Sequence, residues 1–257
     1  MNKKYFFFDI DGTLTNKDTK EVVPSALKTL KLLQEKGHFV AIATGRAHYK
    51  AIHFMQEIGL KNMVCNGGHG IVINNQLIEN SPLNFKDCLA IIQQAQTLGY
   101  GVLVAPYDNK DVYGQDFLFL KQAGFRKEPS TYYFDPQYQF DKFHNIYKMY
   151  ISIPQEKEHE LTLKDTVGHL RFEKEYLMFQ PDCKRTGIEK MMAYLKADQK
   201  DVVVFGDDYN DIDMFQGDWY SIAMGNACDE LKKNASETTE KNIDDGIYKA
   251  CLRHGWI

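Results

Sequence analysis

The sequence predicts an α/β fold, a doubly wound and mainly parallel sheet with a second, α+β domain inserted into it. Short apolar runs without alternation end abruptly in polar residues or glycine, as in strands covered on both faces. Segments with helical spacing separate these runs, and alternating strands and helices build right-handed βαβ units. The apolar runs that we expect to be strands are residues 5–8, 39–43, 63–65, 202–205 and 222–224.

Three helices are expected between these strands. The first begins at Pro24, because proline is favoured in the first turn of a helix, and it ends at Gly37. The second covers residues 47–58, and the third lies around residues 188–195, before the strand at 202–205.

The middle of the chain has a different pattern. Its strands are less continuous and more polar, as in an antiparallel sheet with one solvated face. The expected elements are a helix at 85–98, strands near 101–105 and 147–153, and a final strand pair within 169–180. We therefore predict an inserted domain at 83–180, and a core domain made of 1–82 and 181–257.

Composition narrows the function classes. The 257 residues are 44% hydrophobic and 26% charged, as in ordinary soluble proteins, and the net charge of −4 argues against a nucleic-acid binder with a basic excess. The five cysteines form no CxxC pair, which favours free thiols in a reducing cytosol. No apolar run approaches the roughly 20 residues of a membrane span. We expect a cytoplasmic protein, monomer or homodimer, without nucleic-acid or membrane partners.

Polar side chains follow three of the predicted strands. Ligands of open α/β sheets bind beyond the carboxyl ends of the strands, and a parallel sheet brings these ends to one edge. The three polar segments are Asp9-Ile10-Asp11-Gly12-Thr13, Thr44-Gly45-Arg46 and Gly206-Asp207-Asp208-Tyr209-Asn210-Asp211. We expect all three to converge at one site.

Asp9, Asp11, Asp207 and Asp211 would then form a cluster of four carboxylates. Asp9 and Asp11 are two positions apart, so their side chains point the same way along an extended segment. Two like charges roughly 4 Å apart repel by about 4 kcal/mol at an effective dielectric of 20, so the cluster calls for a cation. Oxygen ligands with room for water suit Mg²⁺. Asp208, considered by itself, is expected to be a solvated turn residue or a helix cap.

Thr44 and Lys184 supply groups that a phosphoryl site needs. A hydroxyl at a strand end can donate to a phosphate oxygen, and an ammonium can neutralise charge on the transferring group. Gly12 and Thr13 permit a tight turn whose amides face an anion. Alone, Thr44 is more typical of a helix cap and Lys184 of a surface position, so only their combined placement indicates a phosphoryl site.

These segments resemble the four ordered motifs of the haloacid dehalogenase-like hydrolase superfamily, and especially its Cof-type sugar-phosphatase branch. The resemblance covers nearly the whole core, and the inserted segment only by its length and position. Arg185 departs from the pattern, because the family usually has glycine after the motif lysine. Further segments that resemble this branch are Asn66-Gly67-Gly68, Ala223-Met224-Gly225-Asn226-Ala227 and Asn242-Ile243-Asp244-Asp245-Gly246-Ile247.

The resemblance implies a Mg²⁺-dependent phosphatase that hydrolyses small phosphate monoesters, such as sugar phosphates, through an aspartyl-phosphate. Asp9 would be the nucleophile, and Asp11 the general acid and then the general base. Magnesium would be held by Asp9, the backbone carbonyl of Asp11, Asp207 and, directly or through water, Asp211. Thr44 and Lys184 complete the implied catalytic set. The implied substrate-binding residues are Gly12, Thr44, Gly45, Arg46, Asn66, Lys184 and Asn210, with Asn210 orienting Lys184 or the substrate.

In this family the core is Rossmann-like, and the inserted domain resembles a C2-type cap that closes over the site. The resemblance implies hinges at 66–82 and 180–183. Four residues of the insert are candidates for substrate contacts, although core packing and solvation are at least as well supported for each: Tyr107, Tyr113, Arg126 and Lys148.

A phosphomutase of the phosphomannomutase type is the main alternative, because it shares the DxDGT start and a similar cap. Receiver domains lack such an insert and the Gly-Asp-x-x-Asn-Asp loop, and a P-type pump would need spanning helices. A dehalogenase lacks the second acid, present here as Asp11. Three histidines, His48, His53 and His69, are expected to be structural rather than metal ligands.

Overall fold

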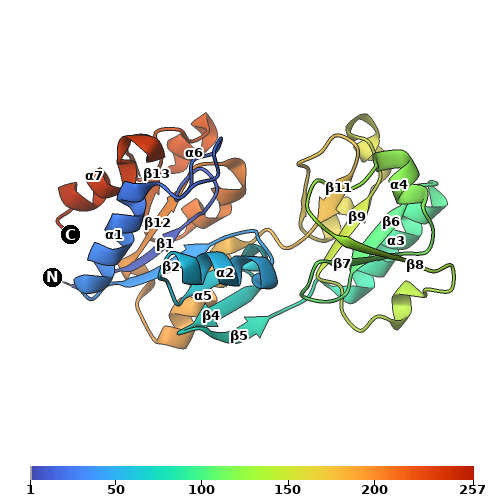
Figure 1. The fold of residues 1–257 in the computed structure, drawn as a ribbon, viewed down its shortest axis with the longest axis horizontal. Helices are drawn as coiled ribbons and strands as arrows, with labels where there is room; N and C mark the ends of the chain where they lie inside the picture. Colours follow the sequence, from blue (N-terminus) through green and yellow to red (C-terminus); the bar gives the residue numbers. More distant parts are fainter. Residues whose placement is uncertain (1) are drawn as a thin grey trace. The chain divides into compact units, whose positions relative to one another are not determined.

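An eight-stranded sheet is the framework of the larger part of the chain, as the computed structural model of residues 2–257 shows (Figure 1). The strand order is β14-β13-β12-β1-β2-β3-β4-β5; the strands from β14 to β3 run parallel, and β4 and β5 form an antiparallel hairpin at the edge. The strands are β1 Tyr5–Phe8, β2 Phe39–Ala43, β3 Met63–Cys65, β4 Gly70–Ile73, β5 Gln76–Asn80, β12 Val202–Gly206, β13 Tyr220–Ala223 and β14 Glu237–Thr238.

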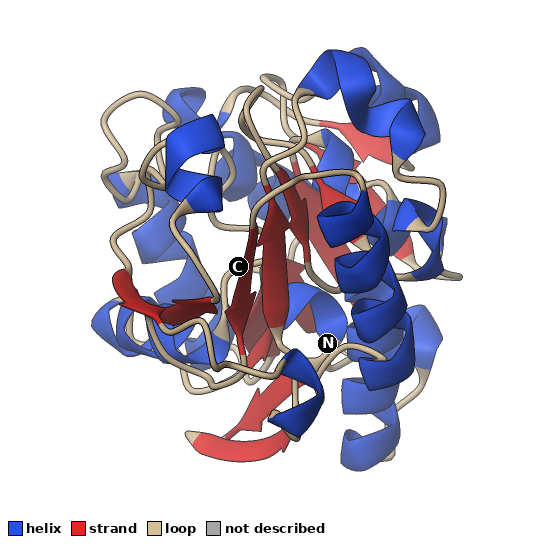
Figure 2. Ribbon diagram, turned by 90° about the vertical axis from the view of Figure 1, so that its right-hand side faces the viewer, coloured by secondary structure: helices blue, strands red, loops and turns tan. Residues whose placement is uncertain are grey.

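Helices cover both faces of this sheet (Figures 1 and 2). Along β1, the side chains of Phe6 and Phe8 enter one apolar cluster and Phe7 enters the other, so the strand is buried on both sides. This double burial explains the uninterrupted apolar run in the sequence. On the first face lie α1 (Pro24–Glu35), α2 (His48–Glu57) and α7 (Gly246–Arg253); on the second lie α5 (Lys184–Leu195) and α6 (Asp229–Asn234).

The predicted doubly wound, mainly parallel core is confirmed, with differences at its edges. The strand expected at 222–224 is β13 and begins two residues earlier, at Tyr220. The β4–β5 hairpin was not predicted as strands, and it corrects the expected hinge at 66–82, because residues 70–80 are hydrogen-bonded into the sheet. No helix of residues 2–257 has the length and apolar character that crossing a membrane requires.

Residues 81–182 form a second compact unit, and the remaining residues form the first. The second unit contains a six-stranded sheet of order β10-β11-β9-β6-β7-β8. Its elements are α3 Phe85–Thr97, β6 Val102–Ala105, β7 Asp111–Gly114, α4 Leu118–Ala123, β8 Thr131–Phe134, β9 Lys148–Ile151, β10 His169–Leu170 and β11 Leu177–Phe179.

This second sheet is mostly antiparallel, as its polar strands predict, with one exception. The strands β7 and β8 pair in parallel, with Tyr113 opposite Tyr133. The connection between them contains α4, which carries the chain back to the starting end of β7 and so allows the parallel pairing. The aromatic segment at 130–134 is largely this edge strand.

Candidate active site

The neighbouring strands β1 and β12 bring three acidic side chains together beyond their carboxyl ends. Phe8 pairs with Phe205, and the backbone N–H of Asp9 continues the ladder by donating to the Phe205 carbonyl at 3.0 Å. One carboxylate oxygen from each of Asp9, Asp207 and Asp211 lies within 4.8 Å of the others, and all three side chains are buried. Parallel strand pairing therefore produces the convergence that the sequence predicts for these three acids.

Lys184 is the cation of this cluster. Its Nζ lies 2.7 Å from Asp9 Oδ1 and 2.6 Å from Asp211 Oδ1, and the side chain is only 1% exposed. Burial alone would lower the pKa of Lys184, but the carboxylates of Asp211 and Asp9 outweigh burial and raise the pKa above its ordinary value. Lys184 thus stays charged, and Asp211 orients it; the expected role of Asn210, which was to orient Lys184 or the substrate, stays a prediction.

Asp211 has both carboxylate oxygens engaged. While Oδ1 accepts from Lys184, Oδ2 accepts from the backbone N–H groups of Asp207 at 2.8 Å and Asp208 at 3.1 Å. This closes the turn after β12 and fixes Asp207 relative to Lys184. These three contacts use most of the acceptor capacity of the carboxylate, and the expected role of Asp211 as a metal ligand stays a prediction.

Asp207 has an unsatisfied oxygen that points to a cation. Its Oδ1 accepts from the Thr13 hydroxyl at 3.1 Å, whereas the buried Oδ2 has no hydrogen-bond partner. Burial, followed by the charge of Asp211, raises the pKa of Asp207 to about 7. Burial and the charge of Asp211 also raise the pKa of Asp9. The three carboxylates exceed the single ammonium of Lys184, so a divalent cation with oxygen ligands fits the residues present.

The absence of a side chain at Gly12 leaves space for Oδ2 of Asp207. The backbone of Gly12 has φ +93, and a Cβ at this position would overlap with the Asp207 carboxylate. The Gly12 carbonyl accepts from Asn226 Nδ2 at 2.8 Å, which anchors the turn from the other side. The tight turn predicted from Asp11-Gly12-Thr13 therefore packs its backbone directly against Asp207.

Asp11 lies apart from the three buried acids. Its carboxylate is held by the Arg46 guanidinium, with Nη2 2.9 Å from both oxygens and Nε 3.2 Å from Oδ2. The Asp11 side chain is 47% exposed, which suits a group that must meet a substrate. Thr44 is buried, and its hydroxyl accepts from the Arg46 backbone N–H at 3.1 Å. Asp11 and Arg46 were expected at one site, but no pattern in the sequence predicts their ion pair.

Asn66 and its two glycines support the start of α5. The Asn66 backbone N–H donates to the Arg46 carbonyl at 2.7 Å, and the Cys183 N–H donates to the Gly67 carbonyl at 2.8 Å. Gly68 packs against Cys183 so closely that a Cβ would overlap with its carbonyl. This segment therefore fixes the residue directly before Lys184, and substrate binding by Asn66 remains a proposal.

Arg185 fits the helix despite departing from the family pattern. Its backbone N–H donates to Asp213 Oδ2 at 2.8 Å, so Asp213 satisfies an amide of the first turn of α5. The conformation here is helical, which arginine adopts as readily as glycine, and the backbone shape of the loop is preserved.

Two asparagines of the site were missed as functional residues. Asn226 binds the Gly12 carbonyl, and Asn242 donates from its backbone N–H to Asn226 Oδ1 at 2.9 Å and from Nδ2 to the Thr15 carbonyl at 2.8 Å. Both lie in segments that resemble the family, which was the available signal. Their contacts with Gly12 and Thr15 span 214 and 227 positions, and no local pattern predicts such a pairing.

The candidate residues of the second unit divide into two kinds. Arg126 is buried, lies 3.7 Å above the Tyr150 ring and pairs with Glu128 at 2.8 Å, which is a structural environment. Tyr113 stacks on Tyr133 with ring centroids 5.0 Å apart and meets Tyr107 edge-on at 6.0 Å. Tyr107 is 53% exposed, so this aromatic group presents a surface that a ligand can contact.

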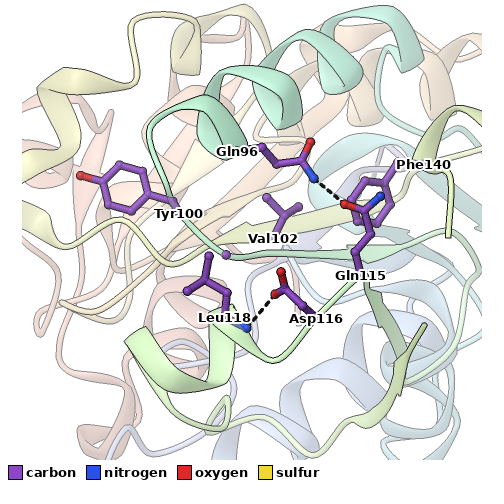
Figure 3. A pocket seen from close by; sticks show the side chains of 8 residues that line it. Gln96, Tyr100, Val102, Gln115, Asp116, Leu118 and Phe140 are labelled. Atoms are coloured by element: carbon purple, nitrogen blue, oxygen red, sulfur yellow. Dashed lines mark hydrogen bonds between the residues drawn. The ribbon is translucent and has the colours of Figure 1, made fainter. Parts of the chain in front are cut away.

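A cavity of about 180 Å³ in the second unit holds none of the predicted site residues (Figure 3). Gln96 and Gln115 lie on one side of it and hydrogen-bond each other, and Asp116 accepts from the Leu118 N–H. Its polar groups are therefore largely satisfied within the protein. Within residues 2–257, no group of metal-type ligands includes His48, His53 or His69.

The family model of the haloacid dehalogenase-like hydrolases matches residues 6–251. The chain belongs to this family. This confirms the resemblance to the family that was drawn from the four motifs. The chain is 30% identical over 260 residues to "Putative phosphatase YkrA" of Bacillus subtilis (strain 168), and the match covers 100% of both chains.

Two solved structures show the same fold. A protein of Geobacillus kaustophilus HTA426, described only as hypothetical, is 27% identical and superimposes with a TM-score of 0.82 over 100% of both chains. BT1666 of Bacteroides thetaiotaomicron, whose structure is described among phosphatases of the haloalkanoate superfamily, is 22% identical. It has a TM-score of 0.82 and covers 99% of this chain and 96% of its own. The expected α/β fold class of this hydrolase is thereby confirmed.

Proposed function

We propose that this hydrolase is a Mg²⁺-dependent phosphatase that acts on small phosphate monoesters through an aspartyl-phosphate on Asp9. The observation that carries the proposal is the buried arrangement of Asp9, Lys184 and Asp207, with one unsatisfied carboxylate oxygen. Family membership and the relative named as a phosphatase support the same reaction class. No disulfide joins the cysteines of the described residues, in keeping with a cytoplasmic enzyme.

The first step is attack by Asp9 on the phosphorus atom. Lys184 holds Oδ1 of Asp9, which leaves Oδ2 as the attacking oxygen. The new bond joins Asp9 to phosphorus, and the bond from phosphorus to the ester oxygen breaks. Asp11, which carries a proton in this step, gives it to the departing alcohol, and Arg46 holds the Asp11 side chain in position. Lys184 and Thr44 bind the phosphoryl oxygens.

The second step regenerates the enzyme. Asp11, now ionised, takes a proton from a water molecule that attacks phosphorus, and the bond to Asp9 breaks to release phosphate. Magnesium, held by Asp9, the backbone carbonyl of Asp11 and Asp207, would offset the negative charges of nucleophile and phosphoryl group. The Gly12 turn leaves room for the Asp207 carboxylate that would hold the ion.

The second unit is proposed as the cap that contacts the leaving group. Tyr107 and Tyr113 are the candidates for this contact within that unit, because their aromatic group is partly exposed. Lys148 stays a candidate at the start of β9. Arg126 is set aside as a contact residue, because its guanidinium is already stacked on Tyr150 and paired with Glu128.

A screen of phosphate monoesters that measures released phosphate tests the proposal. We expect release with Mg²⁺ and none with EDTA, and we expect Asp9→Asn to lower the rate by about 10³-fold or more. Asp198→Asn, a change at an exposed aspartate, is the matched control and should leave the rate unchanged. Wild-type rates in Asp9→Asn would remove Asp9 as the nucleophile. Conversion of hexose 1-phosphate to 6-phosphate without release would indicate a phosphomutase instead.

A further inference from the structure

Lys17 is a second cation beside the acidic cluster, and the mechanism above does not use it. Its Nζ lies 2.7 Å from Asp208 Oδ2 and 3.8 Å from Asp207 Oδ2, the buried oxygen that lacks a hydrogen bond. Lys17 belongs to the loop after β1, whereas both acids follow β12. The ammonium therefore bridges two loops at the point where the proposed metal would bind.

The loop that carries Lys17 is ordered by its own hydrogen bonds. The Asn16 N–H donates to the Glu21 carbonyl at 2.9 Å, and Asn16 Oδ1 accepts from the Asp18 N–H at 2.8 Å. Thr15 forms a β-bridge with Val22, which closes the base of the loop. Lys17 is thus presented toward Asp208 by a closed turn, although its side chain is 58% exposed.

The balance of charges around the site indicates how Lys17 affects a bound cation. When ionised, Asp9, Asp207, Asp208 and Asp211 supply four negative charges, and Lys17 and Lys184 supply two positive charges. The remaining two negative charges match one divalent cation. Without Lys17 the site would carry one more negative charge, close to Asp207, and would attract a divalent cation more strongly.

We propose that Lys17 is a built-in counter-ion of the metal site, which weakens the binding of Mg²⁺ and stabilises the acidic cluster when the metal is absent. This inference rests on the proposed function, because it concerns the same metal site. The exposed position of Lys17 makes its effect dependent on ionic strength, since salt screens exposed charges over about 10 Å at 0.1 M.

Isothermal titration calorimetry of the EDTA-dialysed full chain with MgCl₂ tests the proposal. We expect Lys17→Met, which keeps the length of the side chain, to bind Mg²⁺ about three- to tenfold more tightly than the wild type in about 20 mM salt. The difference should shrink below about twofold in 0.5 M NaCl. The metal-free variant should melt at a lower temperature than the metal-free wild type.

Two further variants make the test specific. Lys20→Met removes the same charge from an exposed position of the same loop and should leave Mg²⁺ affinity unchanged. Lys17→Arg retains the charge and should bind Mg²⁺ as the wild type does. An unchanged or weaker affinity in Lys17→Met overturns the proposal, as does an equal gain in Lys20→Met. Absence of Mg²⁺ binding by the wild type would instead overturn the metal chemistry of the proposed function.

Discussion

Lys184 and Asp9 form a buried ion pair across 175 positions of the chain, with Lys184 Nζ 2.7 Å from Asp9 Oδ1. Lys184 begins α5 and Asp9 directly follows β1, so the pair joins the two segments of the first unit that the second unit separates in sequence. A buried ammonium without partners costs several kcal/mol, and here Asp9 and Asp211 offset that cost. In the proposed mechanism, the same contact holds Lys184 beside Asp9, where its ammonium binds the phosphoryl group.

Lys184→Met should therefore damage both stability and activity. Removal of the ammonium leaves the buried carboxylates of Asp9 and Asp211 without their cation, and breaking such a buried pair costs about 3–5 kcal/mol. Urea unfolding of the metal-free protein measures the loss of stability, and phosphate release measures the activity, which should fall by about 10²-fold or more. Lys190→Met, on the same helix and 42% exposed, should cost less than about 1 kcal/mol. Equal effects of the two changes would contradict the assigned role of Lys184.

Without metal, the stability of the protein should fall as the pH rises from about 4 to about 7. Burial raises the pKa of Asp207 from its ordinary 3.8 to about 7, so the folded state binds more protons than the unfolded state in this window. Each such group lowers the free energy of unfolding by about 1.4 kcal/mol per pH unit at most. Asp9, whose pKa burial also raises, contributes in the same direction.

Urea midpoints measured from pH 4.5 to 7.5 in EDTA check this dependence. Asp207→Asn cannot ionise and should show a shallower decline than the wild type. Saturating Mg²⁺ should remove most of the decline, because a bound cation stabilises the ionised carboxylates. Equal slopes for Asp207→Asn and the wild type in EDTA would show that Asp207 does not titrate in this range.

Gly12→Ala should abolish turnover while leaving a folded protein. The added Cβ would overlap with the Asp207 carboxylate, and φ +93 disfavours any residue other than glycine. We expect a loss of stability of about 1–3 kcal/mol and a weakening of Mg²⁺ binding of tenfold or more. Calorimetry and urea unfolding measure the two effects. Gly37→Ala, at a positive φ with open space around it, is the control and should leave Mg²⁺ binding unchanged.

The sequence predicted the parts of the site that depend on the sheet. Asp9 and Asp207 each follow an apolar run, and the rule that parallel strands end at one edge brings them together. The pairing of Asp11 with Arg46 was not predictable, because it depends on the course of two loops. The contacts of Asn226 and Asn242 could not be predicted for the same reason, since asparagines in loops follow no periodic pattern. Short edge strands such as β14, with two residues, are too brief for any pattern.

Asp213→Ala should weaken the start of α5 by about 1 kcal/mol, the usual cost of losing a helix cap. Asp213 Oδ2 accepts from the backbone N–H of Arg185 at 2.8 Å, and Lys184 directly precedes Arg185 in the chain. Urea unfolding measures the loss, and Asp213→Asn, which keeps an acceptor, should recover most of it. A loss of activity beyond about tenfold would show that Asp213 does more than cap the helix.

Arg46→Lys should lower kcat/KM about tenfold, a loss of about 1.4 kcal/mol, with little effect on stability. The guanidinium contacts both oxygens of Asp11, and a lysine ammonium cannot reproduce this planar, two-point contact. The loss of stability should stay below about 1 kcal/mol, because the Asp11 side chain is 47% exposed. Steady-state kinetics on an ester with an alcohol leaving group measures the first effect. An ester with a nitrophenol leaving group, which needs little protonation, should show a smaller loss, since the arginine acts by positioning the general acid. An equal loss on both esters would place Arg46 on the phosphoryl group rather than on Asp11.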